Sequence, residues 1–530
     1  MSKGYRAEDY QITKASVQFE TDKPELRWLF ERCEAHCVEN QAVFNDKKVL
    51  REGSIYDGVW AETQPMGGEM YAKRDIACAL NNQLIFMEHQ RKDGRLPGTI
   101  FYGDFLGVQV CYDWMGFCFA LPAFKMFFLA GHDKGYLKLL YQCLRDFDGY
   151  LWKYRDSNGD GCLETWCTWD TGEDNATRFT ELGVPDGRCG GEHAPLGIGK
   201  LPYASMDVMS YSCQARAVLA DISDILQNQE GDLWRQRAKE VRDKIRSYLW
   251  IEEKNACYDR DCENQIMDIL LHNNLRCMYF GAFDQDMADR FLKYHLFNSE
   301  EFWTPIPLPS VAANDAMFRN ENSNSWSGAV QGLTYQRAIQ ALELYGHMAE
   351  IRILGKKWIQ LLCDKKHLVQ QYDPFDGTPC VDHTGNIAPD GYGPTILAAL
   401  EYLALLCGVR VAVDQVEFSA VRDWHNGIYQ QEMLGHLYQL RVQNNRMTAL
   451  MDGEELFTAD CGVSITTDME GNIQWIWGIE EQKQTIQIQC VGETFCGEIF
   501  PNQQVRCEKG GFTECKHIAF DFPFMSNPKQ

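Results

Sequence analysis

The sequence predicts a mainly α-helical fold, an (α/α)6 toroid of helical hairpins followed by a smaller β-rich, sandwich-like domain. From Pro24 to about Gly408, amphipathic patterns of roughly 15 to 20 residues follow one another in pairs. Within most pairs the connection is short, as at Gly346-His347, whereas connections between pairs are long and rich in Gly, Pro, Trp and Asp. After Arg410 the pattern changes to short alternating strands. These three observations together point to the toroid and its appended domain.

Apolar residues recur at helical spacing in about eleven stretches. These are Pro24–Asn40, Ala72–Gln90, Asp113–Gly131, Lys134–Arg155, Ser205–Gln227, Glu230–Leu249, Ile269–Gly281, Phe283–Tyr294, Ser325–Gly346, His347–Cys363 and Tyr392–Leu406. Short connections close antiparallel hairpins on one side, so all the long links fall on the other side, where they can wall a cleft. A solenoid of helix pairs would share this local pattern, but the chain shows no fixed-period repeat.

The predicted domains follow the same patterns. Residues 1–55 form an N-terminal lead-in, residues 56–408 the catalytic barrel, and residues 409–530 the β-rich domain. The predicted strands of that last domain are Val411–Phe418, His436–Val442, Val463–Thr467, Ile473–Trp477, Thr485–Val491 and Gln504–Cys507. Turns at Asp452-Gly453 and at Glu470-Gly471-Asn472 separate some of them.

Composition and charge narrow the class of protein. The chain has 530 residues, of which 45% are hydrophobic, 24% charged and 12% aromatic, as in a globular protein. Its formal charge of -24 and isoelectric point near 5.0 would repel phosphate backbones and anionic lipids. We therefore expect neither nucleic acid nor a membrane as partner. A neutral, polyhydroxylated substrate suits this surface better.

Several features predict a cytoplasmic protein without cofactor. The segment Met1–Thr13 has no apolar run, and Phe117–Gly131, the most apolar segment, is shorter than the roughly 20 residues of a membrane helix. The 21 cysteines are scattered like small core residues, without zinc-binding spacing, so we expect no metal. Asp156–Gly161 matches the start of a calcium loop, but Cys167 stands where the bidentate glutamate would be. We interpret this segment as a turn.

The loop Thr165–Phe179 concentrates chemistry-bearing residues. Its middle, Trp169-Asp170-Thr171-Gly172-Glu173-Asp174-Asn175, offers a ring for stacking on a sugar and acids that transfer protons or bind hydroxyls. Such residues are also ordinary in turns, and tryptophan is often simply buried, so the loop alone leaves both interpretations open.

The other long links repeat the same theme of aromatic residues beside acids. Their members are Trp60, Glu62, Glu69, Arg74-Asp75, Tyr112-Asp113-Trp114, Glu192-His193, Asp207, Trp303, Asn314, Asp315, Trp326, Tyr372, Asp373, Asp376, Asp382 and Asp390. Any single pair, such as Asp113-Trp114, can equally be a helix cap with a core aromatic. If all these links lie around one rim of the barrel, the whole set favours sugar recognition. The pairs Gly67-Gly68 and Gly190-Gly191 lack the context of a phosphate loop and are expected in tight turns.

The segment Trp169–Asn175 resembles the Trp-Glu/Asp-Ser/Thr-Gly-x-Asp-Asn signature of the trehalase and glycoside hydrolase family 63 group, which includes mannosylglycerate-hydrolase-like domains. Further similar segments extend the resemblance over roughly residues 60 to 408. They are Ser205–Leu219, Leu249-Trp250, Tyr258–Asp261, Pro307–Ser310 leading to Asn324–Gly328, and Tyr372–Gly377.

The resemblance implies an (α/α)6 barrel that hydrolyses an α-glycoside with inversion. Asp174 matches the general acid, whose pKa a loop shielded by Trp166 and Trp169 could raise by desolvation. The base should be a carboxylate about 6.5 to 9.5 Å away, leaving room for a water. The residues expected to bind substrate are Arg74, Asp75, Asp113, Trp114, Trp169, Asp170, Glu173, Asn175, Asp207, Trp326, Gln370 and Tyr372.

The chain departs from the family pattern at two positions. Gln370 stands where the family has its catalytic glutamate, and Ser327 replaces the arginine of the Trp-Arg-Gly motif. Glutamine cannot take a proton from water, so the candidate bases are Asp373 first, and then Asp376, Asp382 and Asp390 on the same link. We therefore expect a glycosidase for a short α-linked glucoside or related oligosaccharide. The alternatives are a carbohydrate-binding protein that has lost its base, and a phosphorylase or isomerase on the same barrel.

Overall fold

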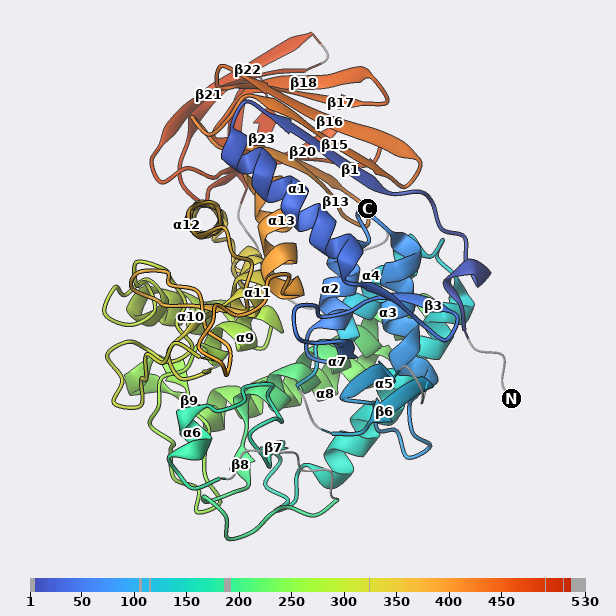
Figure 1. Cartoon of the computed structure of the whole chain (residues 1–530). Helices are drawn as coiled ribbons and strands as arrows, with labels where there is room; N and C mark the ends of the chain where they lie inside the picture. The colour runs from blue at the N-terminus through green and yellow to red at the C-terminus, as the bar shows by residue number, and fades with distance from the viewer. Residues whose placement is uncertain are drawn as a thin grey trace.

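The computed structural model describes residues 5–103, 107–113, 116–184, 192–323, 325–490, 492–508 and 510–515. Trp114, the pair Gly190-Gly191 and Asn324 lie outside these residues. Two large antiparallel sheets stand at one end of the molecule and the helices fill the rest (Figure 1). The helix α1 runs close to the boundary between the two parts (Figure 1).

The helices in the described part of the chain lie between Pro24 and Cys407. They are α1 (Pro24–Glu39), α2 (Gln64–Tyr71), α3 (Ile76–Glu88), α4 (Ala120–Leu129), α5 (Lys134–Tyr154), α6 (Thr177–Thr180), α7 (Met206–Leu226), α8 (Gly231–Lys244), α9 (Asn273–Tyr279), α10 (Gln285–Phe291), α11 (Gly332–Glu343), α12 (Met348–Lys365) and α13 (Gly393–Cys407). Short π-helical turns, Ile245–Leu249 and Leu292–Leu296, extend α8 and α10.

Helix boundaries follow local chemistry. Asp75, Asp133 and Ser205 each place a side-chain oxygen on a backbone N–H of the first turn that follows, which satisfies a donor without an intrahelical partner. Gly131 and Gly346 lie in the links after α4 and α11 with positive φ of 70° and 80°, a conformation that costs glycine little. These residues produce the short hairpin links that the sequence predicts.

Alternate helices form a closed cycle of contacts. Each helix of the series α2, α4, α7, α9, α11 and α13 packs against the next, and α13 packs back against α2. Their hairpin partners α3, α5, α8 and α12 pack against α2, α4, α7 and α11. Such a cycle fits a helical toroid.

The chain ends in two stacked antiparallel sheets. The seven-stranded sheet has the order β1-β15-β16-β17-β18-β21-β22, and the six-stranded sheet has the order β13-β14-β19-β20-β23-β24. Their strands are β13 (Gly408–Val411), β14 (Val416–Ala420), β15 (Gly427–Met433), β16 (His436–Gln443), β17 (Arg446–Met451), β18 (Glu454–Asp460), β19 (Val463–Thr467), β20 (Ile473–Gly478), β21 (Gln484–Cys490), β22 (Glu493–Ile499), β23 (Gln504–Glu508) and β24 (Gly511–Cys515).

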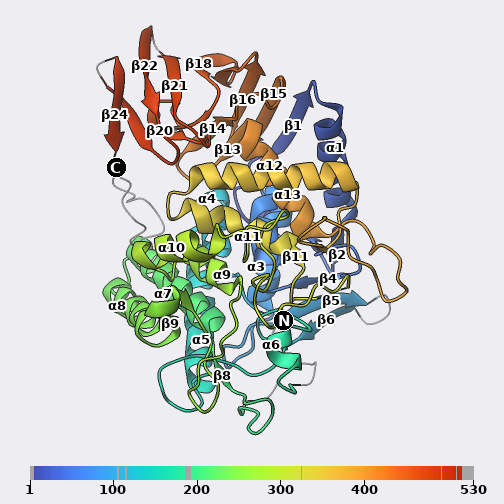
Figure 2. The same ribbon diagram turned by 90° about the vertical axis from the view of Figure 1, so that its left-hand side faces the viewer.

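The N-terminal segment joins both parts of the molecule. Strand β1 (Ser16–Thr21) pairs antiparallel with β15 at the edge of the seven-stranded sheet, from Ser16 opposite Glu432 to Thr21 opposite Gly427. Helix α1 follows it and packs on α12 and α13, which lie directly below the sheets (Figure 2). Residues close to the N-terminus therefore complete the β-rich part. Strands β1 and β15 are about 400 residues apart in the sequence, so no local pattern indicates that they pair.

Several predicted elements differ from the structure. The predicted helix Ser325–Gly346 begins only at Gly332, because Val330-Gln331 forms strand β11, which pairs with β12 (Gln371-Tyr372). The predicted strand Val411–Phe418 is instead the hairpin of β13 and β14. Gly67 and Gly68 are not in a tight turn. They belong to α2, and a Cβ on Gly68 would lie 2.7 Å from Asn82 of α3, so this glycine allows the two helices to approach closely.

The remaining strands are short and lie in the links between helices. They are β2 (Gln41–Phe44), β3 (Lys47–Leu50), β4 (Gly58–Trp60), β5 (Thr99–Gly103), β6 (Gly107–Cys111), β7 (Glu164-Thr165), β8 (Tyr203-Ala204), β9 (Trp250-Ile251) and β10 (Ala256-Cys257). In Asp156–Gly161 the Asp156 carboxylate accepts from Gly161 N, and Asp160 Oδ1 accepts from Cys162 N at 2.8 Å, as in a turn.

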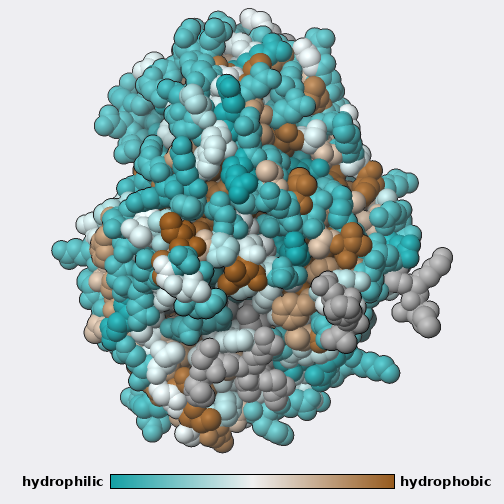
Figure 3. Space-filling model, in the orientation of Figure 1, coloured by the Kyte–Doolittle hydropathy of each residue, from teal (hydrophilic) through white to brown (hydrophobic). Residues whose placement is uncertain are grey.

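The surface of the molecule carries both polar and apolar residues. The face shown in Figure 3 is mainly hydrophilic, with scattered hydrophobic residues over the helical part. Within the described ranges, no helix combines the length and apolarity that crossing a bilayer requires. In the same ranges, no three His, Cys, Asp or Glu side chains are grouped as metal ligands would be.

Candidate active site

The loop Thr165–Phe179 begins with β7 and ends in α6, and its first acid is structural. Asp170 is buried, and its Oδ2 lies 2.6 Å from Arg155 Nη1 at the end of α5. The same carboxylate accepts the backbone N–H groups of Trp166 and Cys167. The Arg155 guanidinium also lies over the ring of Trp166, 4.1 Å from its centroid. Asp170 thus fixes the first half of the loop.

The second acid, Glu173, is the centre of a buried ion-pair cluster. Its carboxylate lies 2.7 Å from Arg178 Nη2 and 3.0 Å from Arg276 Nη2. Burial opposes its ionisation, but Arg178 and Arg276 outweigh burial and hold the pKa of Glu173 well below its usual range. Burial lowers the pKa of His272, so its neutral ring donates from Nε2 to Glu173 Oε1 at 3.0 Å. The Thr334 hydroxyl lies 3.0 Å from the other ring nitrogen.

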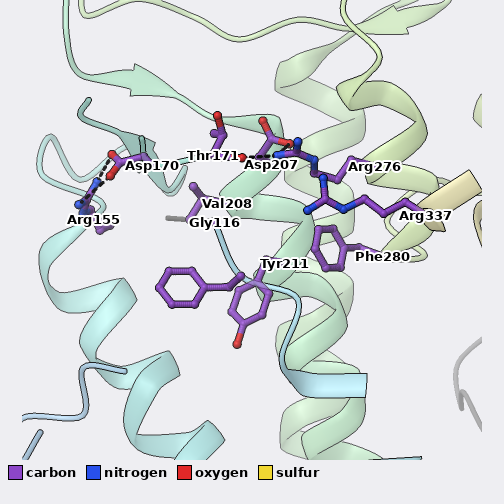
Figure 4. Close-up of a pocket in the computed structure, with 11 residues that line it drawn as sticks. Gly116, Arg155, Asp170, Thr171, Asp207, Val208, Tyr211, Arg276, Phe280 and Arg337 are labelled. Carbon is purple, nitrogen blue, oxygen red and sulfur yellow. Dashed lines mark hydrogen bonds and ion pairs between the residues drawn. The ribbon is translucent and has the colours of Figure 1, made fainter. Parts of the chain in front are cut away.

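Asp207 and Asp259 complete this cluster beneath the loop. Asp207, near the start of α7, pairs with Arg276 at 3.2 Å and with Arg178 at 3.5 Å. Asp259 pairs with Arg178 at 2.8 Å, yet burial raises the pKa of its carboxyl to about 6. Figure 4 shows Asp207 and Arg276 meeting beside Thr171, whose carbonyl accepts from Arg276 at 2.7 Å. The enclosed cavity drawn there has a volume of about 20 Å³, room for a single water and not for a sugar.

Glu62 lies on the other side of the loop. Its carboxylate pairs with Arg337 of α11 at 3.1 Å. A Cβ added to Gly172 would lie 1.8 Å from Glu62 Oε2, so only glycine allows the loop to approach this carboxylate. Burial raises the pKa of Glu62, and Arg337 offsets part of that effect. Glu62 therefore lies directly against the backbone that leads to Asp174.

Asp174 is half-buried and belongs to a second group of residues. It interacts electrostatically with Glu52 and with Tyr56, both from the link before β4. Glu52 is buried and accepts a hydrogen bond from the Thr63 hydroxyl at 3.1 Å. Burial, and then the negative charge of Glu62, raise the pKa of Glu52 to about 8. The Tyr56 hydroxyl donates to Gln370 Oε1 at 2.9 Å, so Gln370 lies in the same group.

Contacts between the long links bring their residues to one end of the ring. The Thr177 N–H donates to Ser327 Oγ at 2.7 Å, and the Thr177 hydroxyl donates to Met317 O at 2.9 Å. Arg319 pairs with Glu181 at 2.6 Å, and Asn320 donates to Asp373 at 2.8 Å. Ser327, which replaces the arginine of the family motif, therefore joins two links.

The candidate bases of the 372–390 link all accept hydrogen bonds from other groups of the protein. Asp373 accepts the N–H groups of Phe375 and Asp376, and Asp376 accepts that of Thr378, as in Asx turns. Asp382 is partly exposed and accepts from Thr384 N. Burial opposes ionisation of Asp390, but hydrogen bonds from His36 and Leu368 outweigh it and lower its pKa. None of these bonds involves the Thr165–Phe179 loop.

Other predicted substrate contacts lie apart from Asp174 or inside the core. Arg74 follows α2 at its far end and pairs with Glu34 of α1, while Asp75 caps α3. Asp113 is buried and precedes α4 by several residues, so it is not the cap of that helix. Tyr372 is a core residue that donates to His367 O and packs on Trp358. Trp326 is buried beside His272, and Trp114 lies outside the described residues.

Of the remaining predicted contacts, Trp169 is half-buried and Asn175 is exposed next to Asp174. Sequence reasoning missed the roles of Glu52, Tyr56, Arg276 and Arg337. One signal was available for the two arginines, because each lies within a predicted helix directly beside apolar residues, where a charge needs a buried partner. Glu52 has no such signal, since it lies in the lead-in whose fold depends on distant contacts.

Comparisons with known proteins agree with this fold. A crystal structure of a GH63 mannosylglycerate hydrolase from Thermus thermophilus, in complex with glucose, matches with a TM-score of 0.57 and 15% identity, over 71% of this chain and 99% of that one. Neutral trehalase Nth1 from Saccharomyces cerevisiae matches with a TM-score of 0.51 and 13% identity, over 74% of this chain and 77% of that one. At these identities the likeness concerns the fold.

A curated relative, an uncharacterized protein from Borreliella burgdorferi, is 23% identical over 186 residues, which is 33% of this chain. The chain spans about two fifths of that relative's length, 39%. The model of the mannosylglycerate hydrolase MGH1-like glycoside hydrolase domain matches residues 77–386, more than half of the 530 residues. The chain therefore belongs to the MGH1-like glycoside hydrolase family.

Proposed function

We propose that the chain is an inverting glycosidase that acts on a short α-linked glucoside or related oligosaccharide, with Asp174 as general acid. The observation that carries the proposal is the unequal use of the acids in one loop. Asp170 and Glu173 are buried in ion pairs with Arg155, Arg178 and Arg276. Asp174, by contrast, is half-buried and interacts electrostatically with Glu52.

The proposed architecture is an (α/α)6 toroid of residues 56–408 with a β-rich domain of residues 409–530. The closed cycle of α2, α4, α7, α9, α11 and α13 supports the toroid. The junction of α13 and β13 at Cys407-Gly408 supports the second boundary. Trp169 and Asn175, on either side of the acidic residues, are proposed to contact the sugar.

The test combines product stereochemistry with one variant. Proton NMR during hydrolysis of α,α-trehalose, maltose, kojibiose and nigerose should show β-glucose as the first product from at least one of them. Asp174→Asn should lower kcat by roughly 10³-fold while the variant keeps its unfolding temperature. Release of α-glucose alone as the initial product from α,α-trehalose, or an Asp174→Asn variant as active as the parent, would contradict the proposal.

A second candidate is favoured by Gln370, which stands at the position of the family's catalytic glutamate. A chain without any base would bind sugars and leave them intact. A base whose place is taken by a phosphate ion would give a phosphorylase. Calorimetric binding without turnover would support the binding protein, and turnover that requires phosphate would support the phosphorylase.

A further inference from the structure

The segment 52–56 is docked along the end of the link that carries Gln370. The Gly393 N–H donates to Glu52 O at 2.7 Å, and the Ser54 hydroxyl donates to Pro389 O at 2.7 Å. A Cβ on Gly53 would lie 2.4 Å from Gly391 O, so this residue must be glycine for the two segments to meet. Its φ of 87° also favours glycine.

Two tyrosines connect the side chains of Glu52 and Gln370. Tyr392 is hydrogen-bonded to Glu52, and Tyr56 donates to Gln370 Oε1 at 2.9 Å. The rings of Tyr56 and Tyr392 lie 5.9 Å apart. The carboxyl of Glu52 is therefore joined, through two neighbouring tyrosines, to the amide that replaces the family's glutamate. Because Tyr56 already donates to the amide oxygen, the Gln370 NH₂ group is the part available to hold a water.

We propose that Glu52 is the general base of this chain and replaces the glutamate missing at position 370, an inference that rests on the proposed glycosidase function. In the step, the oxygen of a water attacks the anomeric carbon as the bond from that carbon to the glycosidic oxygen breaks. Glu52 accepts the proton of the water, and Asp174 donates its proton to the leaving oxygen. Gln370 donates a hydrogen bond to the attacking water and takes no proton.

The neighbouring carboxylates fit this role less well. Glu62 is paired with Arg337, and its Oε2 lies against the backbone of Gly172, which leaves little room for a water on that side. Asp373 is engaged by two backbone N–H groups and by Asn320. The partners of Glu52 in the described residues are the hydroxyls of Thr63 and Tyr392, which leave it a stronger base than an ion-paired acid.

Chemical rescue tests the assignment. With α-D-glucosyl fluoride as substrate, Glu52→Gln should lower kcat at least roughly 100-fold. Glu52→Ala with sodium azide should regain at least about tenfold and form β-glucosyl azide, because azide needs no base. Asp174→Asn should keep most of its turnover of the fluoride, whose leaving group needs little protonation. Glu301→Gln, at a partly buried glutamate bonded to His295, is the matched control and should stay within about threefold of the parent.

The outcomes separate this inference from the proposed function. If the parent protein hydrolyses neither α-D-glucosyl fluoride nor the disaccharide panel, the proposed function fails, and the role of Glu52 fails with it. If the parent is active and Glu52→Gln stays within about threefold of it, Glu52 is not the base. If azide rescues Asp373→Ala instead of Glu52→Ala, the base is Asp373. Circular dichroism and the unfolding temperature check that each variant is folded.

Discussion

Among the described residues, a cluster of mostly buried charged side chains at the site and another between helices and sheets differ in their balance of charge. The site cluster comprises Glu52, Glu62, Glu173, Asp174, Asp207 and Asp259 with Arg178, Arg276 and Arg337. The interface cluster, between helices and sheets, comprises Glu343, Glu401 and Glu417 with Lys73, Arg352 and Arg410. The first thus has twice as many acids as bases, while the second has equal numbers.

Some carboxyls of the two clusters have pKa values shifted in opposite directions. In the interface cluster, burial opposes ionisation of Glu401, but Lys73 and Arg410 outweigh it and lower its pKa to about 2. In the site cluster, burial raises the pKa of Glu52 to about 8 and that of Asp259 to about 6. A balanced cluster holds parts of a fold together, whereas surplus acid raises the pKa of carboxyls and so increases the proton affinity of their ionised forms, which suits a general base.

The largest expected effect comes from removing a cation of the site cluster. Arg276→Leu would leave Glu173 and Asp207 with one fewer partner each, and breaking such a buried pair costs about 3 to 5 kcal/mol. Urea unfolding measures the loss. Arg235→Leu is the control, because this exposed arginine pairs with Asp224 at the surface, where a pair contributes at most about 1 kcal/mol. Equal losses in both variants would mean that burial of the cluster does not matter.

The next test concerns the interface cluster and its pH dependence. The pKa of Glu401 in the folded chain, about 2, lies below its ordinary value of 4.5, so the carboxylate stabilises the fold above pH 4.5. That contribution, about 3 kcal/mol at pH 7, should disappear as the pH falls from 4.5 to 2. The parent should therefore exceed Glu401→Gln in stability at pH 7, and the gap should narrow in acid. A gap independent of pH would exclude an ionic role.

For Glu52→Gln, the difference in stability between variant and parent should change with pH in the opposite direction. Its folded pKa, about 8, lies above the ordinary 4.5, so the folded chain holds a proton that the unfolded chain releases, and stability falls between these values as pH rises. At pH 7 the cost is about 3 kcal/mol. The variant should match the parent near pH 4.5 and be the more stable of the two at pH 8, measured by unfolding temperature. A parent that is more stable than the variant at pH 8 would contradict the raised pKa.

The sequence could predict features that depend on neighbouring residues, and could not predict contacts between distant parts of the chain. Hairpin links, helix caps and the Trp169–Asn175 loop depend on neighbouring residues, so local patterns located them. Strand β1 pairs with β15, and Tyr56 contacts Gln370, across several hundred residues, so only the folded chain brings them together. Tyr372 and Arg74 belong to core or interface contacts, although their positions in the links favoured a role in binding substrate.

The smallest expected effect comes from removing the hydrogen bond between Tyr56 and Gln370. Tyr56→Phe removes the hydroxyl that donates to Gln370 Oε1 and leaves the ring between Trp60 and Tyr392. The lost hydrogen bond should cost about 1 kcal/mol of stability. If Gln370 holds the attacking water, a freely rotating amide should also lower kcat by up to about tenfold with little change in KM. A change confined to KM would mean that Gln370 binds the sugar itself, and Tyr438→Phe in β16, also a buried tyrosine, provides the matched control.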